Sequence, residues 1–192
     1  MHMKKLVLFF VILCVSVAAM AQGHMTFKGV EIDGSLSEMV TKLKAKGLTY
    51  LGAEDGIAFM KGDFAGYRDC QIAVFSMKGT GVVNAVGVAF PDREEWSSIE
   101  RDYNLLKEML TEKYGEPSKV IEKFHKNYLP DNWWRFNYLM SDECTWMSVF
   151  ETEKGDIELF MQKLDYREAC VMLKYYDRAN SDVVRSAAMD DL

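Results

Sequence analysis

One stretch of the sequence, DREEWSSIERDYNLLKEMLTEKYGEP at positions 92–117, constrains the fold more than any other. Its large apolar side chains recur at steps of three and four residues, which places them on one stripe of an α-helix. We expect a capping box at Asp92 and Glu95 to start the helix, and Gly115 to end it. A helix with this much apolar surface must pack on another layer. The stripe consists of Trp96, Ile99, Tyr103, Leu106, Leu110 and Tyr114.

A shorter amphipathic helix is expected at 36–46. Ser35 and Glu38 have the spacing of a capping box, and Gly47 favours a helix end. Four strand-like runs follow, and the stretch 78–81 between the last two is typical of a hairpin turn. The fourth run is apolar on both faces, so we expect it to be a central strand. The four runs are 48–53, 57–61, 69–77 and 82–90.

Strand-like runs return after the long helix. We assign 133–140 to a strand because its side chains alternate, with Trp134 and Phe136 on one face and Trp133 and Arg135 on the other. The tail from residue 178 onward is expected to form a short helix. The expected strands of this half are 119–124, 133–140, 145–151, 156–162 and 169–176.

This order of elements predicts an α+β fold, with one or two antiparallel sheets and two amphipathic helices packed on one face. We expect residues 22–192 to form a single domain, because their number suits one sizeable core. The halves 34–90 and 91–177 have the same helix-then-strands order, which is compatible with a tandem α-β4 repeat. The halves share no convincing residue-by-residue identity.

Residues 1–21 have the three parts of a secretory signal peptide: two early lysines, the apolar run 6–18, and a small-x-small cleavage site ending at Ala21. We therefore expect export to the periplasm or the cell exterior, with no membrane insertion after cleavage. The alternatives are an uncleaved anchor and a lipoprotein attached through Cys14. The bulky Leu13 argues against the lipoprotein.

The charge of the mature chain bears on its partners. The signal holds two of the 23 basic residues and none of the 29 acidic ones, which leaves a mature net charge of −8. An acidic chain without basic runs is a poor match for nucleic acid or an anionic membrane. A protein or peptide partner is compatible with this charge, and the sequence sets no oligomeric state.

Two segments and the predicted cleavage junction resemble known proteins. The Gln after the junction, the segment KYGEP at 113–117 and the segment GDFAG at 62–66 are similar to uncharacterised small exported proteins of gut Bacteroidetes. The order of elements resembles the β-lactamase-inhibitor-protein fold. That resemblance implies two helix-plus-four-strand repeats that pair into one concave sheet. Neither resemblance implies particular functional residues.

Reactive side chains are few in the mature chain. Cys70 and Cys170 lie in strand-like runs, so either one bridge forms or all three thiols, with Cys144, stay reduced and buried. His24 and His125 are far apart in sequence, and we expect no metal site and no cofactor. We expect no catalytic residues either, because no nucleophile elbow or phosphate loop is present.

One constellation favours binding. Trp133 and Arg135 on the outward face of their strand, with Tyr128 nearby, have the composition of a binding hot spot. We therefore expect a non-enzymatic exported module that recognises a protein, peptide or envelope ligand through an exposed sheet face. The alternatives are a small periplasmic hydrolase with a site built from distant residues, and an apolar-ligand carrier.

Overall fold

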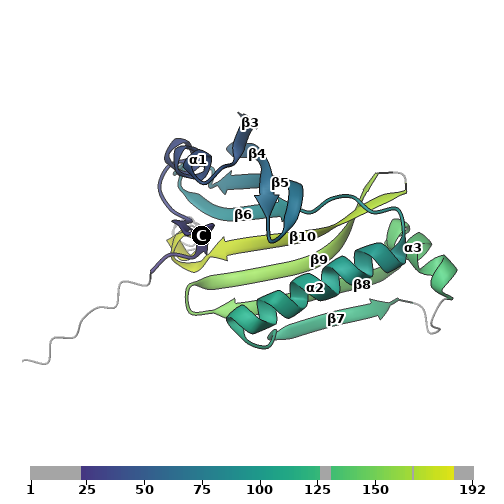
Figure 1. The fold of residues 1–192 in the computed structure, drawn as a ribbon. Helices are drawn as coiled ribbons and strands as arrows, with labels where there is room; N and C mark the ends of the chain where they lie inside the picture. The colour runs from purple at the N-terminus through teal and green to yellow at the C-terminus, as the bar shows by residue number, and fades with distance from the viewer. Residues whose placement is uncertain (1–22, 126–130, 166, 184–192) are drawn as a thin grey trace, which may run out of the picture.

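The computed structural model describes residues 23–125, 131–165 and 167–183, and only the backbone of Asn132 and Trp133. The predicted signal peptide lies outside these residues. Helices and antiparallel strands make up the described chain, which confirms the predicted α+β class (Figure 1). Besides helices α1 to α3, a helical stretch covers 178–183. Within the described residues, no helix has the length and apolarity needed to cross a membrane.

The first half follows the predicted order closely. Helix α1, Leu36–Ala45, starts at the predicted capping box, in which the Ser35 hydroxyl accepts from the Glu38 N–H and the Glu38 carboxylate accepts from the Ser35 N–H. A two-stranded hairpin precedes it. The strands of this half are β1 Thr26–Phe27, β2 Val30–Glu31, β3 Thr49–Glu54, β4 Ile57–Phe64, β5 Tyr67–Ser76 and β6 Val83–Ala89.

The long helix, α2, spans Trp96–Tyr114 and starts later than predicted. The predicted capping box is wrong: Glu95 is the N-cap, but its side chain makes no cap hydrogen bond within the described chain, and Asp92 lies outside the helix. The preceding backbone instead runs beside β10, where the Arg93 N–H donates to the Ala169 carbonyl at 2.7 Å. Strand pairing therefore satisfies these backbone groups before the helix can begin.

One element of the second half contradicts the prediction. Residues 133–140 are not a strand, because helix α3 spans Asn132–Met140. Aromatic residues favour strands, and their alternation suggested one here. The helix is instead anchored by the buried Leu139 and by Tyr138, whose ring lies edge-on to Phe124 at 5.7 Å. The strands of this half are β7 Lys119–Phe124, β8 Cys144–Thr152, β9 Gly155–Asp165 and β10 Glu168–Asp177.

Eight strands form one antiparallel sheet in the order β3-β4-β5-β6-β10-β9-β8-β7. Each half supplies four neighbouring strands, and the halves meet where β6 pairs with β10. In Figure 1 the sheet twists strongly, so that β4 and β5 run steeply while β7 to β10 run nearly level. The order matches two α-β4 units, with α3 inserted in the second. The tandem repeat itself stays a prediction, because element order alone does not establish a duplication.

Helices α1 and α2 lie on the same face of the sheet, as predicted. Tyr103 of α2 binds Ser148 of β8 through a buried hydrogen bond of 2.7 Å between their hydroxyl oxygens. The N-terminal hairpin covers the same face, where the Phe27 ring stacks on Phe64 at 5.0 Å. The core therefore lies between this face and the helices. One registered row of buried side chains across it is Met60, Ile72, Val88, Leu173 and Leu159.

The three cysteines of the described chain are free, buried thiols. This is the second of the two predicted alternatives, and Cys70 and Cys170 form no bridge between them within the described chain. Burial raises the pKa of Cys70, and it raises the pKa of Cys144 and of Cys170 to about 12 each. All three act as small apolar side chains in the core.

Candidate functional site

The sheet face opposite the helices carries a second set of apolar side chains. None of the described helices packs on it, and we call it the open face. Strand pairing defines its rows, one of which joins Phe59, Ala73, Gly87 and Lys174. Phe59 is exposed and the other apolar side chains are half-buried. They are Ile57, Phe59, Ala73, Phe75, Ala89, Ile121, Met147, Val149, Phe160 and Met172.

Aromatic and charged groups interlock at the centre of the open face. The Lys174 ammonium lies 5.1 Å from the centre of the Phe75 ring and 5.2 Å from that of Tyr176, within cation–π range. The Tyr176 hydroxyl donates to Glu158 at 3.1 Å. Burial, followed by the neighbouring Glu158 carboxylate, raises the pKa of Tyr176 to about 12. These contacts hold the side chains at the centre of the open face in place.

Charged side chains border the open face. Lys119 and Lys123 project from β7, the edge strand of the second half, while Glu151 and Asp156 face each other across β8 and β9, near the Lys119 end of β7. Asp156 accepts from Arg178 at 2.9 Å. Charges of both signs therefore border the open face.

The predicted binding residues lie elsewhere. Tyr128 falls outside the described residues, and Trp133 belongs to α3, so the proposed outward strand face does not exist. Arg135 also belongs to α3. Its guanidinium lies 3.9 Å from the Glu100 carboxylate and 5.9 Å from the centre of the Phe124 ring. The structure therefore places Arg135 at a cleft on the helix side of the sheet.

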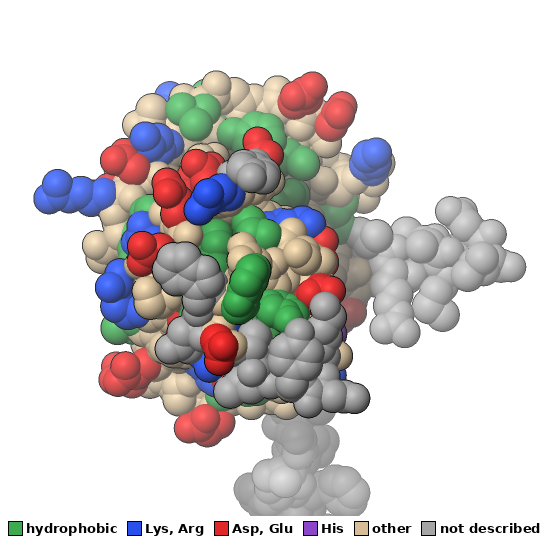
Figure 2. Space-filling model, turned by 90° about the vertical axis from the view of Figure 1, so that its right-hand side faces the viewer, with side chains coloured by type: hydrophobic (Ala, Val, Ile, Leu, Met, Phe, Trp, Pro, Cys, Tyr) green, Lys and Arg blue, Asp and Glu red, His purple; other side chains and the backbone are tan. Residues whose placement is uncertain are grey.

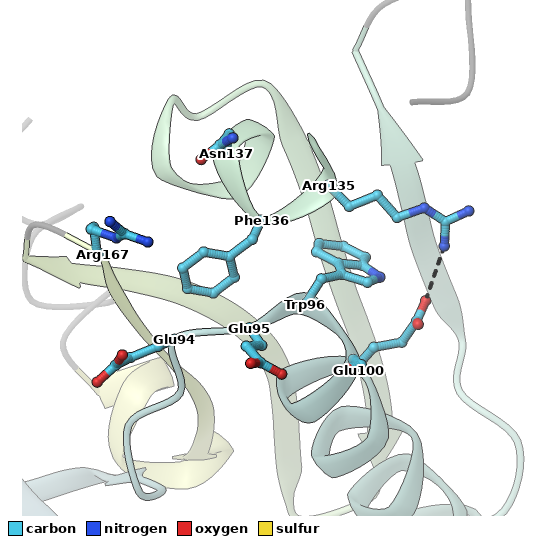
Figure 3. Close-up of a pocket in the computed structure, with 9 residues that line it drawn as sticks. Glu94, Glu95, Trp96, Glu100, Arg135, Phe136, Asn137 and Arg167 are labelled. Atoms are coloured by element: carbon cyan, nitrogen blue, oxygen red, sulfur yellow. Dashed lines mark ion pairs between the residues drawn. The ribbon is translucent and has the colours of Figure 1, made fainter. Parts of the chain in front are cut away.

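This cleft has a volume of about 640 Å³ and lies between the start of α2 and α3 (Figure 3). Phe136 and Trp96 form its apolar walls. Figure 3 shows Arg167 on the same side as Glu94, and the Arg135–Glu100 pair at the opposite end. The complete lining is Glu94, Glu95, Trp96, Ser97, Glu100, Arg135, Phe136, Asn137 and Arg167.

Trp96 is anchored deeply beside the cleft. Its ring is nearly perpendicular to that of Trp146 at 4.7 Å, and Phe124 lies 5.4 Å away. The buried Trp96 Nε1–H has no acceptor among the described residues. A buried donor in this state costs about 1–3 kcal/mol. The packing of three aromatic rings therefore fixes this indole despite an unsatisfied polar group.

A second hollow of about 690 Å³ adjoins the cleft and shares Asn137 and Arg167 with it. Trp134, which is 56% exposed, and Leu164 line it together with Met140. Figure 2 shows this end of the molecule, where hydrophobic side chains gather near the centre and charged ones surround them. Together the two hollows follow one side of α3, and we call them the α3 groove.

Cys144 and His125 are the residues that a cysteine hydrolase would use as nucleophile and base, but the Cys144 thiol is not activated. The His125 Nε2 lies 2.8 Å from the Thr145 hydroxyl, which gives the ring a hydroxyl partner. Burial raises the pKa of Cys144 to about 12, and the charge of Asp142 adds to this. A reactive cysteine needs a lowered pKa instead. Cys144 is therefore a core residue.

His24 joins the two ends of the described chain. Its Nδ1 lies 3.0 Å from the Oδ2 atom of Asp177, a fully buried carboxylate that also accepts from the Met25 and Asn180 N–H groups. Figure 1 shows the N-terminal segment beside the end of β10. Asn180 in turn donates to the Val83 carbonyl at 2.9 Å. Within the described residues, no group of three or more His, Cys, Asp or Glu side chains could hold a metal ion.

Replacing His24 by glutamine should remove a pH-dependent part of the stability. Burial alone would lower the pKa of His24, but the hydrogen bond and charge of Asp177, together with Asp33, raise it above 6.5. A raised folded-state pKa stabilises the fold below the unfolded-state value and loses that effect as the pH rises through the folded-state value. Near pH 5, the free energy of unfolding of the parent should exceed that of His24→Gln by on the order of 1 kcal/mol. Urea unfolding from about pH 5 to pH 8 measures the difference, and a difference that grows with pH would contradict the assignment.

Comparison with known proteins yields no relative: the chain matches no family model, no curated protein and no solved structure. The resemblances to the β-lactamase-inhibitor-protein fold and to small exported proteins therefore stay predictions.

Proposed function

We propose that the protein is an exported, non-enzymatic binding module whose open face binds a folded protein partner. The proposal keeps the predicted binding through a sheet face and replaces the predicted residues. The observation that carries it is a set of apolar side chains spread across seven strands, on the face that no described helix covers. Apolar bands of this kind on soluble proteins mark interaction sites.

The breadth of the open face favours a protein over a small ligand. Seven strands spaced at about 4.8 Å span roughly 29 Å, and three rows of side chains span roughly 15 Å along the strands. The resulting area, on the order of 400 Å² before side-chain relief, is about half of the roughly 800 Å² that each partner contributes to a standard interface. A small ligand would leave most of it uncovered.

The side chains of the open face suit a protein interface. Aromatic residues and methionines are enriched at the centres of such interfaces, and here they include Phe59, Phe75, Met147 and Phe160. The border carries charges of both signs, with Lys123 at one end of β7 and Glu151 and Asp156 near its other end. A partner with the reverse arrangement of charges would be oriented by it. Export is supported by the sequence of residues 1–21.

Replacing Phe59 by glutamate should weaken partner binding at least about 30-fold, the effect of losing an interface hot spot. A charge at this position would be buried against the partner without a counter-ion. The partner is first captured by a photo-crosslinking residue at position 160 in native envelopes and identified by mass spectrometry. The purified pair is then titrated calorimetrically.

Tyr50→Glu is the matched control. Tyr50 and Phe59 are 42% and 43% exposed, but Tyr50 pairs with the buried Met60 and so lies on the helix side. We expect Tyr50→Glu to bind like the parent. If both variants lose partner binding equally, or if Phe59→Glu loses none, the open face is not the binding site. Crosslinking to a second copy alone would identify a self-association surface instead.

A further inference from the structure

The α3 groove lies on the helix side of the sheet, away from the open face, and carries its own pattern of charge. Arg167 pairs with no described residue, and the same is true of Glu94 and Glu95. In Figure 3 the Arg167 side chain lies above that of Glu94, and Glu95 lies below the Phe136 ring. Unpaired charges of opposite sign therefore line the same unfilled space.

The other charges of the groove are already paired. Arg135 lies 3.9 Å from Glu100, and Lys163 pairs with Asp142. These two ion pairs therefore differ from Arg167, Glu94 and Glu95, which have no ion-pair partner among the described residues. A ligand that carries both a cation and an anion would complement Arg167 and the two glutamates.

Apolar surface continues from these charges along α3. Trp134 and Leu164 are both exposed, although each is large and apolar, and they face the hollow that also contacts Arg167. The Asn137 side chain lines both hollows and can donate or accept hydrogen bonds. Each hollow has the volume of a small-molecule site, which is about 300–1,000 Å³.

The backbone at Arg167 adds a further sign of constraint. Its φ angle is 66°, in the left-handed region that residues other than glycine rarely adopt. The next residue, Glu168, begins β10, so the strand holds this turn in place. The same region holds five other non-glycine residues of the described chain, so the angle belongs to the turn between β9 and β10 and fixes where the Arg167 side chain starts.

We infer that the α3 groove binds a short peptide with free ends and a large apolar side chain. Arg167 and Asn137 bind its terminal carboxylate, while Glu94 and Glu95 bind its terminal ammonium group. The apolar side chain lies against Trp134. This site is independent of the proposed function of the open face.

Calorimetric titration of the mature protein with the tripeptide Ala-Leu-Ala, in free, N-acetylated and C-amidated forms, tests the inference. Arg167→Gln should weaken the free and acetylated forms about tenfold and leave the amidated form unchanged, since that form has no carboxylate to lose. Glu94→Gln combined with Glu95→Gln should weaken the free and amidated forms and leave the acetylated form unchanged. Arg68→Gln, an exposed arginine on β5, should bind like the parent.

The outcomes separate this site from others. If no free form binds at millimolar concentration, or if blocking the ends changes nothing, the inference is wrong. Tighter binding of decanoate than of the free peptide would also overturn it and indicate a lipid-like carboxylate instead. Phe59→Glu should keep peptide binding, so failure at the open face and failure at the groove remain distinguishable.

Discussion

An aspartate in place of Leu106 is expected to abolish the cooperative unfolding of the protein. Leu106 is 2% exposed and lies on the buried stripe of α2. Truncating such a leucine already costs about 2–5 kcal/mol, and burying an unpaired carboxylate adds several more. The sum reaches the roughly 5–15 kcal/mol that stabilises a typical domain. Thermal melting followed by circular dichroism measures the effect.

The neighbouring residue supplies the control. Leu105 is 46% exposed, so Leu105→Asp introduces the same charge on the solvent side of the same helix. We expect its free energy of unfolding to lie within about 0.5 kcal/mol of the parent. A cooperative transition of Leu106→Asp near the parent midpoint would contradict the placement of α2 on the sheet.

Gly155→Ala should be the second most damaging of the changes considered. Gly155 starts β9 with φ at 152°, and an added Cβ would lie 1.9 Å from the Tyr176 carbonyl oxygen on β10. Because the obstructing atom is backbone, β9 and β10 must separate locally. We expect a loss of about 3–5 kcal/mol, or about 10 °C in Tm.

Gly66→Ala separates the clash from backbone strain. Gly66 also has a positive φ, of 84°, but an added Cβ there would meet no described atom within 4 Å. We expect it to cost only about 1 kcal/mol, which is the strain alone. Equal losses in the two variants would show that the close approach of β10 is not what excludes a side chain at Gly155.

The fold class could be predicted because it depends on local periodicity. The apolar stripe of α2 and the capping box at Ser35 are visible in sequence, and both are present in the structure. The start of α2 could not be predicted, because Arg93 pairs with Ala169, more than seventy positions away. Long-range strand pairing overrides a local capping signal when both compete for the same backbone.

The open face was only partly predictable. Strand β6 is apolar on both sides, and that indicated a central position, which its pairing with β5 and β10 confirms. In β9 the buried Ile157, Leu159 and Met161 alternate with residues of the open face, among them the apolar Phe160. The sequence signal for the open face was a second set of apolar residues in several strands. Only the strand register shows that these residues form one surface, because it aligns Phe160 with Met147 and Met172.

The α3 groove could not be predicted from the sequence. Arg135 was singled out as part of a strand, whereas α3 brings it to the cleft. Arg167 follows β9 in a turn, and no local pattern distinguishes it from other exposed arginines. Its proximity to Glu94 depends on the pairing of residue 93 with β10. The tertiary structure brings these residues together, and no sequence motif marks them.

Hydroxyl-radical footprinting of the protein, purified and within envelopes of the native cells, where the proposed export would place it, tests most directly whether the open face binds a protein. We expect Met147, Phe160 and Met172 to be oxidised in the purified protein and protected in the envelope. Leu105, exposed on α2, should be oxidised equally in both. Equal oxidation of the three open-face residues in the two preparations, with protection elsewhere on the surface, would contradict the claim that this face binds a protein.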